Sequence, residues 1–184
     1  TTHANLAAIL SALKARGIAV AGADRIRLVE QIAVEDLMAL GDFLLLPEDD
    51  LALAAVLKSP LFGIDDDELF EFGYGRRGSL WQALLKRETT SGRLAAAAAQ
   101  LKTWRSRADF LPPYEFYARL LDTEGMRPRM LARLGIEAGE AIDEFLVLAI
   151  AYDEAHRPSL QGFLAWLRSG TSEIKRDMEQ GRDE

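Results

Sequence analysis

The chain has 184 residues, contains no cysteine and carries a formal net charge of −7. This length suffices for one core of ordinary size, or at most two small ones. The lack of cysteine excludes a disulfide framework, a thiol nucleophile and a cysteine zinc site, and the acidic charge argues against a protein that coats nucleic acid by bulk attraction.

Residues 1–31 are predicted to form a helix followed by one short strand. The helix ends at Gly17, where a C-cap glycine is expected, and residues 18–20 suit a strand. Its apolar residues recur at helical spacing: Leu6, Ile9, Leu10 and Leu13. The N-terminus lacks the basic start and cleavage site of a signal peptide, and no apolar run is long enough to cross a membrane. We therefore expect a cytoplasmic protein without membrane contact.

A second helix is predicted to begin at about Ile32 and to run to the residues before Pro47. Its predicted buried stripe consists of Leu37, Leu40, Leu44 and Leu45. Gly41 lies inside this helix, where glycine costs about 1 kcal/mol relative to alanine. Either a close packing partner or a bend is therefore expected at Gly41.

Two short helices and a loop are predicted to follow. Pro47 and the three acids after it indicate a helix start, and the Ser59-Pro60 step ends that helix because a residue before proline avoids the α region. Asp65 precedes Glu68 by three residues, a capping-box-like spacing that opens a helix through Phe72. Three glycines and two arginines then make a flexible basic loop: Gly73, Gly75, Arg76, Arg77 and Gly78.

Two further helices carry two of the three tryptophans. Ser79 is predicted to cap the first, and Thr90 or Ser91 the second. The first buries Leu80, Trp81, Leu84 and Leu85, and the second buries Leu94, Ala97, Ala98, Leu101 and Trp104.

The remainder is predicted to be helical as well. Pro112-Pro113 breaks the chain, and helices follow at about residues 114–121, before Gly135, and at 159–168 and 172–178. The helix predicted at residues 141–155 is apolar nearly all round its middle, from Phe145 to Ile150, which marks it as the most buried helix. The predicted fold is therefore an all-α, irregular multi-helix domain, with one short strand near the N-terminus.

Three acidic or histidine motifs have simple structural interpretations. Residues 153–156 read DEAH, the sequence of a magnesium-binding motif in helicases. No phosphate-binding loop precedes them, which argues against that function. The apolar residues before them keep helical spacing, so we interpret the motif as a solvated helix end. The run from Asp65 to Glu68 lacks the alternating ligands of a calcium loop and is interpreted as a helix N-terminus. His3 and His156 are far apart, without a nucleophile beside them, and are predicted to lie at the surface.

Charge is distributed unevenly along the chain. Residues 1–75 have a net charge of −8, residues 76–107 of +7, and residues 108–184 of −6. The cations of the middle segment are the candidate nucleic-acid-binding residues: Arg76, Arg77, Lys86, Arg87, Arg93, Lys102, Arg105 and Arg107. If Lys86, Arg93, Lys102 and Arg105 share a surface, their charges would neutralise phosphates, and Trp104 or Tyr74 would add stacking. The alternative is that they are solvated arginines and lysines on helix faces, with both tryptophans in the core.

Residues 18–70 resemble the helicase subunit of AddA-type helicase-nucleases, in the UvrD/RecB group of superfamily 1 DNA helicases. The similarity lies in four short pieces: residues 21–25 (AGADR), 33–37 (AVEDL), 47–50 (PEDD) and 58–61 (KSPL). They are similar to the passage from the second motor domain into a helical insertion, subdomain 2B. The resemblance implies that residues 1–42 belong to or border the motor domain and that residues 43–184 form the insertion.

The resemblance implies a role in ATP-dependent unwinding and end resection during double-strand-break repair by recombination. ATP and magnesium are expected for the parent protein, but no catalytic, cofactor-binding or metal-binding residue is assigned in these 184 residues. The implied partners are duplex or single-stranded DNA and the second subunit of the helicase-nuclease. The alternative function is a freestanding helical protein-interaction module whose basic segment binds an acidic partner.

Overall fold

A computed structural model describes residues 27–88 and 91–169 of the chain. Helices dominate these two ranges, which contain no strand, and this confirms the all-α fold. The strand predicted at residues 18–20, the helix before it and the helix at 172–178 lie outside the described residues. The elements in chain order are α3 (Ile32–Leu45), α4 (Asp50–Lys58), α5 (Asp66–Gly73), α6 (Leu80–Leu85), α7 (Arg93–Ala108), α8 (Pro113–Ala118), the π-helical segment η1 (Arg119–Thr123), α9 (Met126–Leu134), α10 (Ala138–Ala155) and a helix over residues 160–169.

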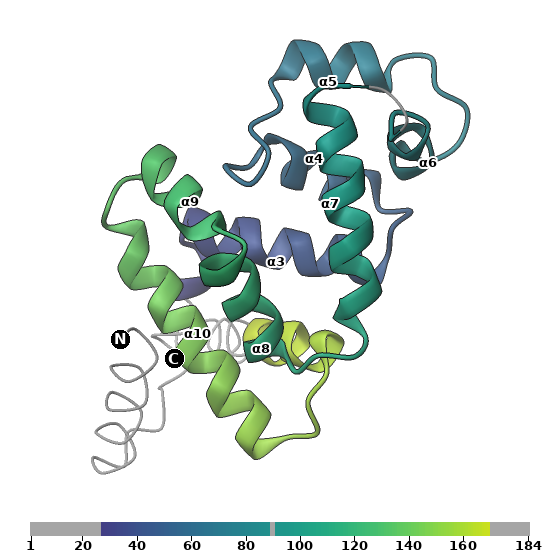
Figure 1. Ribbon diagram of the computed structural model, residues 1–184. Coiled ribbons are helices and arrows are strands. Elements are labelled where there is room, and N and C mark those ends of the chain that lie inside the picture. Colours follow the sequence, from purple (N-terminus) through teal and green to yellow (C-terminus); the bar gives the residue numbers. More distant parts are fainter. Residues whose placement is uncertain (1–26, 89–90, 170–184) are drawn as a thin grey trace, which may run out of the picture.

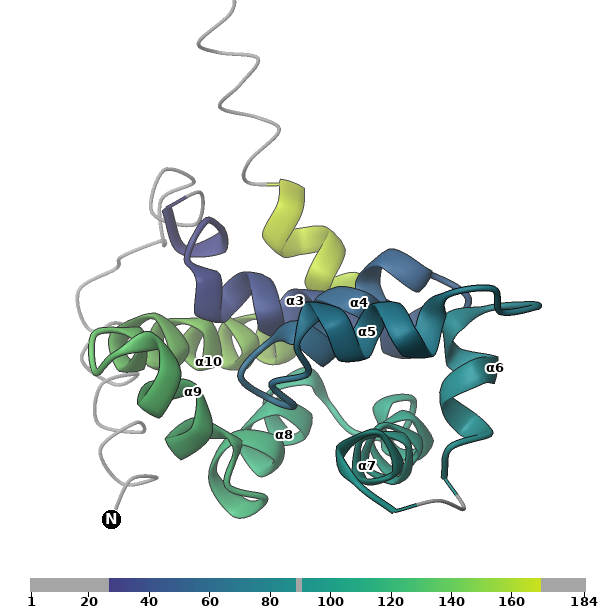
Figure 2. The same cartoon turned by 90° about the horizontal axis from the view of Figure 1, so that it is seen from above.

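Helix α3 runs through the middle of the molecule, with α4 to α7 towards one end and α8 to α10 towards the other (Figure 1). It packs against α4, α7, α9 and α10. The view from above shows the helix over residues 160–169 beside α3, on the side away from α7 (Figure 2). Leu37, Leu40 and Phe43 of α3 are fully buried, so this helix joins both parts of the fold through one hydrophobic core.

The glycine of α3 lies where two other helices pack closely against α3. A Cβ atom on Gly41 would lie 2.7 Å from Leu164 Cδ1 and 2.7 Å from Tyr117 Oη. The Tyr117 hydroxyl is buried and donates a hydrogen bond to the Leu37 carbonyl oxygen, at 3.0 Å. The predicted close packing partner at Gly41 is thus confirmed, and it consists of two side chains distant in sequence.

The predicted buried stripe of α3 is right at three positions and wrong at the fourth. Leu37, Leu40 and Leu44 are buried, whereas Leu45 is exposed. Leu45 is the last residue of the helix and lines a surface hollow with residues of the α7–α8 connection, which leaves 39% of it exposed.

Helix starts show where local sequence signals succeed and fail. Asp65 accepts a hydrogen bond from the Glu68 N–H at 2.8 Å, and Ser79 accepts one from the Gln82 N–H at 3.2 Å, as predicted. The start predicted at Pro47 is displaced: Asp49 is the N-cap, and its carboxylate accepts from two backbone N–H groups. The cap predicted at Thr90 or Ser91 is also wrong, because Gly92 takes the N-cap position with a φ of 112°, a conformation that favours glycine.

The remaining helices follow the predicted pattern apart from three predicted core positions that are only half-buried: Leu85, Leu94 and Ile150. Helix α4 ends before Ser59, and α9 ends before Gly135, as expected. Helix α10 has the predicted buried middle, and every residue from Phe145 to Ala149 is buried. No helix in the part of the chain that the structure describes is long and apolar enough to span a membrane.

The boundary predicted between residues 42 and 43 falls inside α3. Residues on both sides of it, such as Leu40 and Phe43, belong to the same buried cluster as the later helices. Residues 32–42 pack with the helical body, and the assignment of residues 1–42 as part of, or bordering, a motor domain stays a prediction.

Candidate nucleic-acid interface

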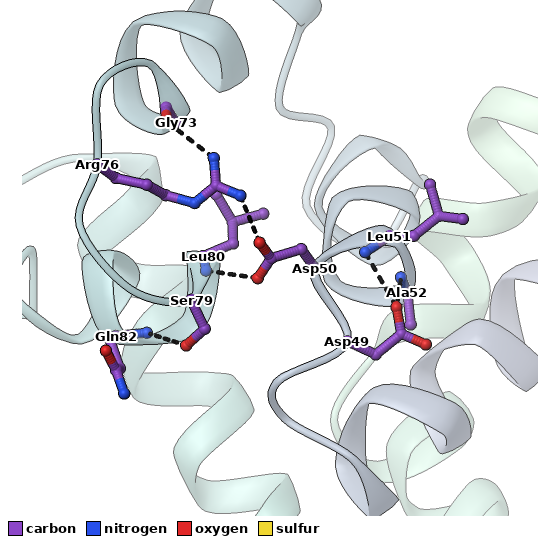
Figure 3. Close-up of polar contacts among 9 residues, drawn as sticks. All are labelled: Asp49, Asp50, Leu51, Ala52, Gly73, Arg76, Ser79, Leu80 and Gln82. Carbon is purple, nitrogen blue, oxygen red and sulfur yellow. Dashed lines mark hydrogen bonds and ion pairs between the residues drawn. The ribbon is translucent and has the colours of Figure 1, made fainter.

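The eight candidate cations lie on the α5–α6 loop, on the end of α6 and along α7. The loop is held at both ends by α4. Asp50, the first residue of α4, accepts a hydrogen bond from the Leu80 N–H at 2.6 Å and forms an ion pair with Arg76 (Figure 3). Arg76 in turn donates to the Gly73 carbonyl oxygen at 2.9 Å. One carboxylate thus connects α4, the end of α5 and the start of α6.

The electrostatics of Asp50 fit this role. Partial burial alone would raise the pKa of its carboxyl group, but the Leu80 N–H and the Arg76 guanidinium outweigh that cost. The pKa of Asp50 is consequently held below its ordinary value. The charge of Arg76 is therefore neutralised within the protein at neutral pH.

Three other candidate cations are also paired internally. Arg93 lies 2.5 Å from a Glu68 carboxylate oxygen and 3.3 Å from Asp65, and it donates to the Gly63 carbonyl oxygen at 2.8 Å. Lys102 lies 3.1 Å from Glu88.

Arg107 lies 2.5 Å from Glu124, which also accepts hydrogen bonds from Gln100 and Trp104. Half of the predicted phosphate-binding set is thus occupied by acids of the same chain.

A subset of cations remains available. Within residues 27–88 and 91–169, Arg77, Lys86 and Arg105 are exposed and make no hydrogen bond or ion pair through their side chains. Arg87 is exposed as well. We call Arg77, Lys86 and Arg105 the free cation set.

The free cation set lies on consecutive elements: Arg77 on the α5–α6 loop, Lys86 directly after α6, and Arg105 near the end of α7. Arg77 and Lys86 flank α6, whose six residues span about 9 Å. The ion pair between Lys102 and Glu88 holds the segment after α6 against the middle of α7. Lys86 is two residues from Glu88, and Arg105 is three residues from Lys102, on a neighbouring part of the helix surface.

The aromatic side chains of this region are either buried in the core or exposed to solvent. Trp104 is 1% exposed and donates its ring N–H to Glu124, and Trp81 packs edge-on against Phe43. Both tryptophans are core residues, so Trp104 is not available for base stacking. Tyr74 is exposed beside Phe70, with 5.1 Å between the ring centroids.

The other predicted motifs are structural. Asp153 lies near the end of α10 and accepts a hydrogen bond at 3.0 Å from the Tyr114 N–H, at the start of α8. Burial raises the pKa of Asp153 above its ordinary value. His156 is exposed and stacks on Tyr152.

The acidic run from Asp65 to Glu68 opens α5, as predicted. No group of three or more histidines, cysteines or acids in the described ranges could hold a metal ion.

Sequence reasoning missed the acids that neutralise the cations. Asp50 lies 26 residues from Arg76, and Glu124 lies 17 residues from Arg107. The one indication in the sequence was the negative net charge of residues 1–75 and 108–184, which could supply carboxylates to pair with the cations of residues 76–107.

A scan against protein-family models and a search of curated proteins each find no match to this chain.

Proposed function

We propose that this chain is a helical accessory module of an AddA-type DNA helicase-nuclease, and that it contacts duplex DNA through the free cation set. The observation that supports this function best is the position of Arg77, Lys86 and Arg105 on consecutive elements, each without a carboxylate partner among the described residues. Phosphate contacts of this kind are independent of sequence and sensitive to salt.

Within such a parent protein the module regulates and does not catalyse. Hydrolysis of ATP with magnesium belongs to the motor domains of the parent, which acts in the cytoplasm during double-strand-break repair. The module packs around one central helix, which suits movement as a single body while it holds the DNA ahead of the motor. The second subunit of the helicase-nuclease is the expected protein partner.

The alternative is a helical interaction module whose free cation set binds an acidic protein. The same side chains would serve it, since carboxylates and phosphates both pair with arginine and lysine. The two functions differ in the polyanion that should bind more tightly. Only the DNA-binding function requires a higher affinity for duplex DNA than for a flexible polycarboxylate.

Fluorescence anisotropy with a labelled DNA duplex tests the proposal. The triple variant Arg77→Gln, Lys86→Gln, Arg105→Gln should lose most of the binding seen at low salt. A matched variant, Arg27→Gln, Arg133→Gln, Arg157→Gln, removes the same charge from exposed positions elsewhere and should bind nearly as well as the wild type.

Polyglutamate serves as the competitor. Failure of polyglutamate to displace duplex at equal charge supports the DNA function. Preferential binding of polyglutamate would favour the acidic-partner alternative, and equal losses in both triple variants would refute the site.

A further inference from the structure

A concave apolar surface crosses α4 and α5. One hollow of about 510 Å³ lies between the start of α4 and α5, and includes Ala54, Leu69, Phe70 and Tyr74. A second hollow of about 600 Å³ continues from α4 towards α3 and α9, and includes Leu51. Both hollows share Ala54, Asp66 and Leu69. We call the combined surface the α4–α5 groove.

The groove exposes large apolar side chains that the fold itself leaves uncovered. Leu51 is 83% exposed, Phe70 66% and Tyr74 75%, while Ile32 at the far end is 62% exposed. Scattered exposed apolar residues are ordinary, but several lining one concave surface mark an interaction site. The paired rings of Phe70 and Tyr74 form one wall of the groove.

The shape of the groove suits a helix. Its two hollows meet at Ala54, where a small side chain keeps the path open between them. The described residues offer no strand edge that could pair with an extended peptide. Recognition would therefore take place through side chains, in the way that an amphipathic helix places its apolar face into a hydrophobic groove.

The charge beside the aromatic wall selects the partner. Asp67 and Glu71 lie one helical turn apart on α5, next to the row formed by Phe70 and Tyr74. Both acids are exposed, and neither has a hydrogen-bond or ion-pair partner for its side chain among the described residues. The other acids at this end, Asp50 and Asp66, are already paired, with Arg76 and Lys58.

The far end of the groove is closer to neutral. Asp36 lines it with a buried carboxylate oxygen, Oδ2, that has no hydrogen-bond partner, and Arg133 lies on the same lining. The excess negative charge is thus concentrated at the aromatic wall. A partner with basic side chains on that side would find complementary charge there.

We propose that the α4–α5 groove binds a basic amphipathic helix of another protein, with its apolar face against Leu51, Phe70 and Tyr74 and its lysines or arginines beside Asp67 and Glu71. None of the three residues of the free cation set lines either hollow, and the proposal stands whether or not the chain binds DNA.

The test uses fluorescein-labelled model peptides of about 14 residues, roughly four helical turns. One is an amphipathic leucine/lysine helix, the second has glutamate in place of lysine, and the third has the leucine/lysine composition in scrambled order. Anisotropy with the full chain should show saturable binding of the first peptide. Its affinity should be at least about tenfold above that of the other two, which corresponds to about 1.4 kcal/mol.

Groove variants and matched controls locate the site. Leu51→Gln with Phe70→Gln should weaken binding about tenfold, whereas Phe110→Gln, at an exposed phenylalanine on the α7–α8 connection, should leave it unchanged. Asp67→Lys with Glu71→Lys should abolish the preference for the basic peptide. Glu115→Lys with Glu140→Lys makes the same charge change on α8 and α10 and should preserve it.

Three outcomes would overturn the proposal. Equal binding of the ordered and scrambled peptides would show unspecific charge attraction, and insensitivity to the groove variants would place the site elsewhere. Sedimentation that reveals a dimer of the chain, dissociated by Leu51→Gln with Phe70→Gln, would assign the groove to a second copy. Circular dichroism of each variant confirms that a loss of binding does not reflect unfolding.

Discussion

Replacing Asp50 by asparagine should weaken the fold and strengthen DNA binding at the same time. The asparagine keeps a carbonyl oxygen that can accept from the Leu80 N–H, but it loses the charge that pairs with Arg76. Arg76 is thereby released from its carboxylate. It would then join Arg77 on the same loop as a cation available to phosphate.

The expected magnitudes follow from exposure and charge. The side chains of Arg76 and Asp50 are 31% and 38% exposed, so solvent screens their ion pair, and its loss should cost about 1 kcal/mol of unfolding free energy. One additional phosphate contact should steepen the salt dependence of duplex binding by about 0.9 in log Kd per log salt. Affinity at low salt should rise about threefold to tenfold.

Urea unfolding measures the first effect, and duplex anisotropy at several salt concentrations measures the second. The wild-type stability advantage over Asp50→Asn should be full at neutral pH. It should disappear as pH falls through the lowered folded-state pKa of Asp50, below the unfolded value of about 3.9.

Asp67→Asn is the matched control, since it removes the same charge from an exposed acid on α5 that holds no cation. A folded Asp50→Asn variant whose affinity and salt dependence match those of Asp67→Asn would refute the reasoning.

Two further predictions concern the core and its pH dependence. Gly41→Ala should destabilise the protein by about 1 kcal/mol, because overpacking against Leu164 and Tyr117 outweighs the helix propensity of alanine. The cost should fall in a Tyr117→Phe background, measured by a double-mutant cycle in urea, and a stabilising alanine would contradict the packing. Burial raises the pKa of Asp36 to about 6, so the folded state loses stability as pH rises from about 4 through 6. Above pH 6, Asp36→Asn should therefore be more stable to urea than the wild type, by about 1 kcal/mol after allowing for solvent screening. Below pH 4, where the carboxyl group is protonated, the two proteins should be equally stable. A variant less stable than the wild type at both pH values would refute this.

The helical fold could be predicted from sequence because its signals are local. The caps at Asp65 and Ser79 depend on residues three positions away, and the buried stripe of α7 follows the helical period. The errors occur where tertiary position decides. Leu45 continues the apolar pattern of α3 but lies at the helix end, on the rim of a surface hollow, and Gly92 starts α7 through its backbone conformation.

The candidate site was less predictable, because its electrostatics depend on pairs distant in sequence. The surplus of cations in residues 76–107 is visible in the sequence, but their partners come mainly from the acidic segments on either side. Asp50 and Glu124 reach Arg76 and Arg107 only after folding. Which cations stay free is therefore a property of the tertiary structure.

The α4–α5 groove was not predicted for a related reason. Helix α5 has eight residues, and its apolar side chains occur on more than one face. Periodicity could not determine that Phe72 would be buried while Phe70 would face solvent. Only the packing of α5 against α4 and α6 selects between them.

The salt dependence of duplex binding tests the central claim most directly. If Arg77, Lys86 and Arg105 each contact one phosphate, log Kd plotted against log salt should have a slope magnitude of about 2.7 for the wild-type chain and near zero for the triple glutamine variant. The control variant at Arg27, Arg133 and Arg157 should keep the wild-type slope. A slope that is the same in the wild type and the triple variant would contradict the assignment of DNA binding to this surface.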